Sequence, residues 1–164
     1  MNMELYTVSL FGHREIRSPN IILERLEQVI QPIILSKSYV EFLIGREGEF
    51  DLLAASVIRR LKRKHDCGNV TLTLVLPYLK AEYRDNEQEY LNYYDEVEIC
   101  EESSKAYFKA AIQLRNRRMA ERSDLVICYV ARNNGGAYWT MQYARRIGVQ
   151  TINLAEKQST ISDN

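Results

Sequence analysis

Four short turns carry the residues best suited to chemistry, and each turn follows directly on an apolar segment. They comprise Gly12, His13 and Arg14; Gly45, Arg46 and Glu47; Pro77 and Tyr78; and Asn134, Gly135 and Gly136. Glycine lets the main chain approach a ligand closely, and arginine can hold a phosphate or carboxylate through two parallel hydrogen bonds. A glycine turn that opens a helix also presents unpaired N–H groups to an anion. These residue types favour a site for a negatively charged small molecule.

Each of these features also has a purely structural interpretation, which the sequence leaves open. Gly135 and Gly136 are equally suited to closing a strand-to-helix turn, and His13 to capping one. Arg46 has Glu47 and Glu49 nearby as ion-pair partners. The tyrosines between positions 78 and 94 suit either stacking on a nucleobase or filling gaps in a core.

Arg115 is a further candidate because of its position on a helical pattern. It lies between Ile112 and Met119 on an otherwise apolar stripe. An arginine that faces a core requires a partner, which is either a buried acid or the anion of a ligand.

Apolar runs and helical patterns alternate along the chain, which predicts strands alternating with helices. Strands are expected at 5–10, 39–44, 70–76, 97–99, 125–130 and 149–154. Helices are expected from about Ile21, ended or interrupted by Pro32; from Phe50 to Cys67; near 85–94; from an N-cap at Ser103 to about Arg122; and from just after Gly136 to Gly148. The stripe at 50, 53, 54, 57, 58 and 61 makes the second helix the clearest element.

This alternation predicts an α/β fold, a Rossmann-like, open and mostly parallel sheet with helices on both faces. In such a sheet, ligands bind beyond the carboxyl ends of the strands. The four polar turns all lie there, so we expect them to meet in one cleft. Residues 1–164 are expected to form a single domain, with a flexible tail of about eight residues.

The composition excludes several classes of function. Lysine plus arginine equals aspartate plus glutamate at 22 each, so no overall field attracts nucleic acid or acidic membranes. The basic run at 59–64 is best explained as a solvated helix end, with a nucleic-acid patch as the alternative. Three cysteines with no metal-ligand spacing argue against zinc or a disulfide framework. No segment resembles a leader or a membrane span, so we expect a cytoplasmic protein.

The sequence lacks the GxGxxG, GxxxxGK[ST], GxSxG and HExxH motifs, but the polar turns together resemble one superfamily. The stretches 11–14, 45–51, 76–78, 115–119 with 123–124, and 134–136 are similar to the YpsA-like branch of the SLOG superfamily. This superfamily includes the LOG nucleotide phosphoribohydrolases and the DprA Rossmann-like domain. The resemblance covers residues 5–154 and implies a nucleotide site at the strand ends. Bacterial members of this kind resemble ligand sensors or binding proteins.

The resemblance to the LOG enzymes also indicates what this chain lacks. Gly135 and Gly136 match the leading glycines of their PGGxGTxxE motif, and Arg115 matches their helix arginine. The threonine of the motif falls on Trp139, with Thr140 one place later, so the resemblance makes Thr140 a further ligand-binding candidate. Gln142 falls where the catalytic glutamate is expected. Glutamine cannot ionise, so it cannot act as a general base. The resemblance therefore implies a non-catalytic, metal-free protein that binds a nucleotide or an NAD- or ADP-ribose-like ligand.

The alternatives are a LOG-like N-glycosidase acting on nucleoside monophosphates or NAD, which would need Glu47 or Glu49 as its acid, and a DprA-like module for single-stranded nucleic acid. The neutral net charge speaks against the second of these. A homodimer through the first helix is a further expectation.

Overall fold

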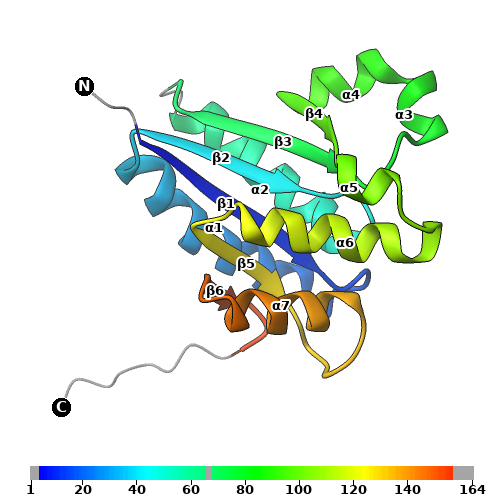
Figure 1. Cartoon of the computed structure of the whole chain (residues 1–164). Coiled ribbons are helices and arrows are strands. Elements are labelled where there is room, and N and C mark those ends of the chain that lie inside the picture. The colour runs from blue at the N-terminus through cyan, green and yellow to red at the C-terminus, as the bar shows by residue number, and fades with distance from the viewer. Residues whose placement is uncertain (1–3, 66–67, 157–164) are drawn as a thin grey trace.

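The structure is a computed structural model that describes residues 4–65 and 68–156, and its strands form one parallel sheet (Figure 1). The strands are β1 (Leu5–Gly12), β2 (Tyr39–Ile44), β3 (Val70–Leu76), β4 (Glu96–Ile99), β5 (Leu125–Tyr129) and β6 (Gln150–Asn153). The helices are α1 (Pro19–Ser36), α2 (Glu49–His65), α3 (Ala81–Asp85), α4 (Glu87–Tyr93), α5 (Glu101–Ser104), α6 (Phe108–Glu121) and α7 (Gly136–Arg146). The expected α/β fold is confirmed, and every strand pairing is parallel.

The strand order places one reversal at the centre of the sheet. The order is β4-β3-β2-β1-β5-β6. The chain runs outward from β1 to β4 and then returns to pair β5 with the free side of β1. At such a switch point the loops after the two strands diverge to opposite faces and leave a crevice between them. The topology therefore predicts a crevice between the loops that follow β1 and β5.

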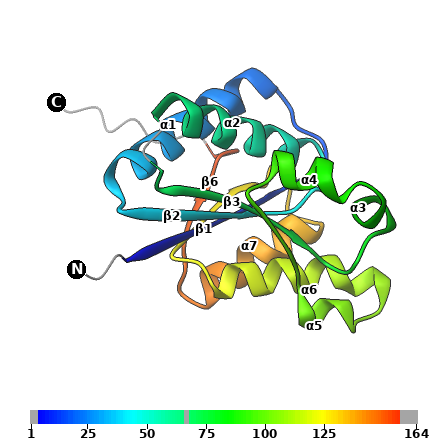
Figure 2. The same cartoon turned by 90° about the horizontal axis from the view of Figure 1, so that it is seen from above.

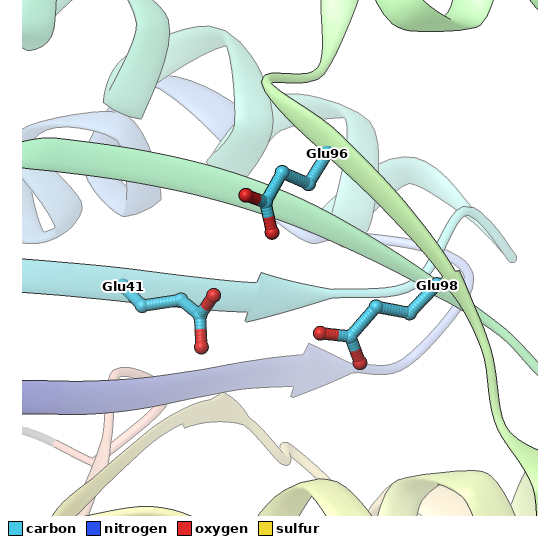
Figure 3. Close-up of side chains that lie close together, drawn as sticks. All are labelled: Glu41, Glu96 and Glu98. Carbon is cyan, nitrogen blue, oxygen red and sulfur yellow. The ribbon is translucent and has the colours of Figure 1, made fainter.

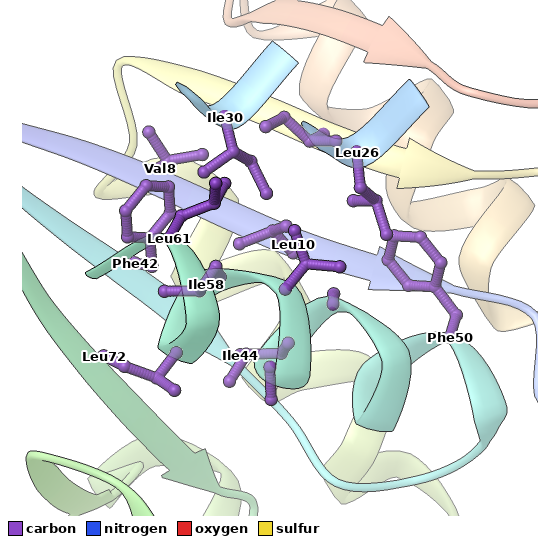
Figure 4. Packing of buried hydrophobic residues seen from close by; sticks show 14 of the residues in the cluster. Val8, Leu10, Leu26, Ile30, Phe42, Ile44, Phe50, Ile58, Leu61 and Leu72 are labelled. Atoms are coloured by element: carbon purple, nitrogen blue, oxygen red, sulfur yellow. The ribbon is translucent and has the colours of Figure 1, made fainter. Parts of the chain in front are cut away.

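Helices cover both faces of the sheet (Figure 2), as the sequence predicts. Helices α1 and α2 lie on one face, and α6 and α7 lie on the other. The larger core lies under α1 and α2, where Leu26, Ile30 and Ile58 pack against strand residues such as Leu10 and Phe42 (Figure 4). All five of these side chains are fully buried. The second face carries a smaller cluster that includes Phe11, Cys128 and Met141.

Two expectations about the helices are wrong. Pro32 neither ends nor interrupts α1, which continues to Ser36. Pro32 is exposed, so the carbonyl oxygen that loses its helical donor can be hydrated, while the buried Ile30 and Ile34 anchor both sides of the proline.

Ser103 is not the N-cap of a long helix. It lies in the separate short helix α5, and α6 begins only at Phe108. The Ser103 hydroxyl, which is fully buried, donates to the carbonyl oxygens of Pro77 and Cys100. The hydroxyl therefore ties α5 to the end of β3 instead of capping α6.

Some expectations fall on residues outside the described ranges. These are the helix end at Cys67 and most of the C-terminal tail, residues 157–164. Within the described ranges, no helix is both long and apolar enough to cross a bilayer.

Candidate functional site

A cavity of about 380 Å³ opens at the switch point between β1 and β5. Its volume lies within the range of roughly 300–1,000 Å³ that small-molecule sites occupy. Four segments line it: the end of β1 with the loop after it, the loop after β2 with the start of α2, the inner face of α6, and the loop from β5 into α7. The lining residues are Leu10, Phe11, Gly12, His13, Arg14, Glu15, Gly45, Glu47, Asp51, Ile112, Gln113, Arg115, Asn116, Arg132, Gly135, Gly136 and Ala137.

The β5 side of the cavity is suited to an anion. Gly135 is the N-cap of α7 and has φ 89° and ψ 170°, a conformation that only glycine adopts readily. It provides no side-chain cap, and the first turn of α7 carries no acidic residue. The free N–H groups and the helix dipole at this end therefore face the cavity without an internal anion to satisfy them. Arg132 lies in the same wall.

His13 lies in the same cavity with an unused ring nitrogen. Its residue is 6% exposed, and its Nε2 has no hydrogen-bond partner among residues 4–65 and 68–156. Its main-chain N–H donates to the carbonyl oxygen of Tyr129 at 3.1 Å, which fixes the turn after β1 to the end of β5. Burial, together with the positive charge of Arg132, lowers the pKa of His13. The lowered pKa favours the neutral ring in the free protein, and the unpartnered Nε2 is available to a ligand.

The β2 side of the cavity holds two carboxyl groups and a buried arginine. Arg115 is 1% exposed and donates to the carbonyl oxygen of Val75 at 2.8 Å and to Asn116 at 2.9 Å. Its Nη1 lies 3.6 Å from Glu47 Oε1, which also accepts from Lys80 Nζ at 2.9 Å. The predicted need of Arg115 for a partner is met by these protein groups.

Asp51 completes this network from the first turn of α2. It is buried, and its Oδ2 accepts from the main-chain N–H of Glu47 at 2.9 Å. Burial raises the pKa of Asp51 to about 6, although that hydrogen bond and the charge of Arg115 act in the opposite direction. A carboxyl group that takes up a proton near pH 6 therefore lies in the wall of the cavity.

Glycines allow the close packing of these walls at two positions. A Cβ at Gly45 would lie 2.8 Å from Nη2 of Arg115, and a Cβ at Gly48 would lie 2.5 Å from the Cα of Arg14. The first contact lets the guanidinium lie flat against the loop after β2. The second joins the loops after β1 and β2, and the N–H of Glu49 donates to the carbonyl oxygen of Arg14 there at 2.8 Å.

The structure brings together eight of the candidate residues that the sequence suggests and leaves five outside the cavity. The eight are Gly12, His13, Arg14, Gly45, Glu47, Arg115, Gly135 and Gly136. Arg46 lies instead against tyrosines in and directly after α4, with Nη1 3.4 Å from the hydroxyl of Tyr94 and its guanidinium over the ring of Tyr90. Tyr78 packs on Phe108, and the hydroxyl of Thr140 donates to the carbonyl oxygen of Gly136. Pro77 and Asn134 also lie outside the lining.

Several lining residues are absent from the candidates that the sequence suggests. Asp51 has a signal that could have found it, because it precedes Ala54, Ala55 and Ile58 by three, four and seven residues on the buried face of α2. A carboxyl group on the buried face of a helix needs a hydrogen-bond or ion-pair partner, and this need marks it as a candidate functional residue. Gln113 and Asn116 flank Arg115 on α6, but nothing in the sequence distinguishes them or Arg132.

Gln142 does not line the cavity, although it matches the glutamate of the LOG motif. Its amide donates to the hydroxyl of Tyr138, one turn earlier on α7, at 2.8 Å. The tyrosines of α3 and α4 also face one another and not the cavity. Tyr90 lies 5.4 Å from Tyr83 and 6.3 Å from Tyr94, measured between ring centroids.

A separate acidic group lies on β2 and β4. Glu41, Glu96 and Glu98 each place a carboxylate oxygen within 4.8 Å of the others (Figure 3). Arg122 pairs with Glu98 at 2.7 Å and lies 3.6 Å from Glu41. Burial raises the pKa of Glu41. This group is partly neutralised by Arg122 and shares no residue with the cavity.

Comparison with known proteins supports the fold. No family model matches the chain, and no curated protein matches its sequence. The structure is similar to that of DNA processing protein A (DprA) from Streptococcus pneumoniae, with a TM-score of 0.64 and 15% identity over 90% of this chain and 49% of that one. It is also similar to DprA from Helicobacter pylori, a structure described for its single-stranded DNA binding mode, with a TM-score of 0.61 and 14% identity over 89% of this chain and 63% of that one.

The chain therefore spans about half of one DprA chain and 63% of the other, and at this identity the likeness concerns the fold. It supports the expected structural similarity to the DprA Rossmann-like domain, in fold alone. The YpsA-like assignment stays a prediction.

Proposed function

We propose that this protein binds a phosphorylated, nucleotide-like small molecule in the cavity between β1 and β5, as a YpsA-like sensor or binding domain would. The observation that carries the proposal is the pairing of the uncapped N-terminus of α7 with the unpartnered, buried Nε2 of His13 in one cavity. Arg132 and Arg14 add positive charge to the same walls. Phosphate groups are bound in this way at helix N-termini in many α/β proteins.

Arg132 provides the direct test of this proposal. Thermal-shift screening and calorimetry with nucleoside monophosphates, ADP-ribose and NAD should identify a compound that raises the melting temperature. Arg132→Ala is then expected to weaken its affinity roughly ten- to hundredfold, because a charge-assisted hydrogen bond to phosphate contributes about 1.5–3 kcal/mol. Arg132 is exposed, so the free variant should unfold like the wild type.

The matched control for this substitution is Arg63→Ala, which removes an exposed arginine from the far end of α2. Its affinity for the same compound should be unchanged. If both variants lost the same affinity, the effect of Arg132→Ala would come from the change in net charge, and Arg132 would not contact the ligand. If none of these phosphorylated compounds binds, the proposed function is wrong.

Binding is also expected to take up a proton at His13. The pKa of His13 is lowered in the free protein, and a phosphate dianion beside it would raise that pKa again. Affinity should therefore increase as the pH falls from 8 to 7, which stays above the pKa of about 6 at which the phosphate itself takes up a proton. Calorimetry in two buffers of different ionisation enthalpy measures the proton uptake, and His13→Gln should abolish it. An uptake that persists in His13→Gln would exclude this histidine as the acceptor.

A short single strand of nucleic acid is the second candidate ligand, favoured by a groove of about 470 Å³ between α6 and α7. Trp139, 55% exposed, lies in this groove with Tyr143, whose ring carries the guanidinium groups of Arg117 and Arg146 at 5.2 and 5.3 Å. Aromatic and cationic side chains together form stacking platforms for bases. Salt-dependent binding of a fluorescent oligonucleotide, compared in wild type and Trp139→Ala, tests this candidate.

A further inference from the structure

The two ends of the cavity carry opposite charges. The end with the carboxyl groups is suited to a ligand group other than phosphate. The end beside β5 carries Arg132 and the start of α7, whereas the end beside β2 carries Glu47 and Asp51. These strands lie on either side of β1, so their ends are about 10 Å apart at two strand spacings. A phosphate bound at the β5 end would leave the rest of the ligand to reach Glu47.

The carboxylate of Glu47 is held in place and keeps one oxygen available. Its Oε1 contacts Lys80 and Arg115, while its Oε2 has no hydrogen bond within the described part of the chain. The side chain is 17% exposed, so the group is largely shielded from bulk water. Its loop is fixed in turn by the bond from the Glu47 N–H to Asp51.

The surrounding charges restrict what this oxygen can accept. A second anion would be repelled by Glu47 itself, and a cationic ligand group would meet the positive charges of Lys80 and Arg115 within 4 Å of the same carboxylate. Neutral donors remain as the favoured partners. The vicinal hydroxyls of a ribose are neutral donors, and a sugar attached to the phosphate lies between the two ends of the cavity.

We propose that Glu47 binds the 2′- and 3′-hydroxyls of the ligand, so that the protein selects ribonucleotides over 2′-deoxyribonucleotides. This rests on the proposed function, because it requires the phosphate to occupy the β5 end. Asp51 acts as a positioning residue that holds the Glu47 loop against the cavity. The same carboxylate-to-ribose contact is used by other α/β nucleotide-binding folds at different positions of the sheet.

The test compares matched ligands before it uses any variant. Calorimetry with AMP and GMP against dAMP and dGMP should give at least tenfold tighter binding of the ribose forms by the wild type. Glu47→Gln should reduce that preference to less than threefold while dAMP affinity changes little, since glutamine retains the shape of glutamate but offers a weaker, uncharged acceptor. The matched control is Glu15→Gln, which alters another carboxylate of the lining and should leave the preference intact.

The possible outcomes separate this inference from the proposed function. If the wild type binds ribose and deoxyribose forms equally, the inference is overturned while phosphate binding stands. If Glu47→Gln keeps the full preference, another residue recognises the hydroxyls and the inference is equally overturned. If neither form binds, nor inorganic phosphate, the proposed function fails together with the inference. Because the wild-type ratio needs no variant, a Glu47→Gln protein that does not fold still leaves the inference testable.

Discussion

Replacement of Arg115 by methionine is expected to lower the free energy of unfolding by about 3–5 kcal/mol. The guanidinium is buried and holds three protein groups at once: the carbonyl oxygen of Val75, the amide oxygen of Asn116 and the carboxylate of Glu47. Methionine fills much of the same volume but makes none of these contacts. The carbonyl oxygen at the end of β3 then loses its donor, and Glu47 and Asp51 lose a neutralising charge. Urea denaturation measures the loss.

Arg117→Met serves as the control, because Arg117 lies two residues further along α6 and is exposed. Its free energy of unfolding should stay within about 0.5 kcal/mol of the wild type, as surface substitutions do. A double variant with Glu47→Gln should lose less than the sum of the two single losses, since the two groups are paired. An Arg115→Met protein as stable as the wild type would show that the arginine is retained for a ligand instead of for the fold.

Much of the fold is predictable from the sequence because the core imposes regular spacings. Strands β2 and β3 begin and end where their apolar runs do, at Tyr39–Ile44 and Val70–Leu76. The helical stripe from Phe50 to Leu61 lies buried as expected, with only Leu53 partly exposed. Where tertiary contacts override local signals, the prediction fails. Ser103 has the chemistry of an N-cap, but its hydroxyl is used by a carbonyl group 26 positions away.

The site is predictable to the level of turns but not of individual side chains. Parallel strands bring their carboxyl ends to one edge, so the meeting of the turns after β1, β2 and β5 follows from the fold class. Neighbouring residues of one turn nevertheless point in different directions. Glu47 faces the cavity, whereas Arg46 stacks on Tyr90. Which of two adjacent charges enters a cavity depends on the aromatic partners of α4, and these become neighbours only in the folded chain.

The second large effect is a gain in stability on replacing Asp51 by asparagine. The pKa of Asp51 is raised from 3.8 to about 6 because the carboxyl group is buried. Folding therefore favours its protonated form, and the free energy of unfolding falls by about 3 kcal/mol as the pH rises from 3.8 to about 6, at 1.36 kcal/mol for each pKa unit. Asparagine avoids this cost and can still accept the N–H of Glu47. Asp51→Asn should thus be more stable than wild type by up to about 3 kcal/mol at pH 7.5.

The pH dependence of this gain distinguishes it from a general packing effect. As the pH falls through 6 towards 4, the wild-type carboxyl group becomes protonated in the folded protein, so the difference between the two proteins should shrink to nearly zero. Asp124→Asn is the control, since Asp124 also accepts a main-chain N–H, from Thr7 at 2.9 Å, but is exposed. No gain is expected there. Equal stability of wild type and Asp51→Asn at pH 7.5 would contradict the prediction.

A residue that lowers stability at neutral pH and lies in a cavity wall is expected to serve the ligand, because such sites commonly trade stability for activity. If Asp51 positions the Glu47 loop through its charge as well as its shape, Asp51→Asn should bind ribonucleotides more weakly while unfolding at higher urea concentration. If Asp51→Asn gains stability and keeps full affinity, the only role of Asp51 is to shape the N-terminus of α2. Measuring both quantities on the same preparation separates these two roles, since a purely structural carboxylate has no reason to move them in opposite directions.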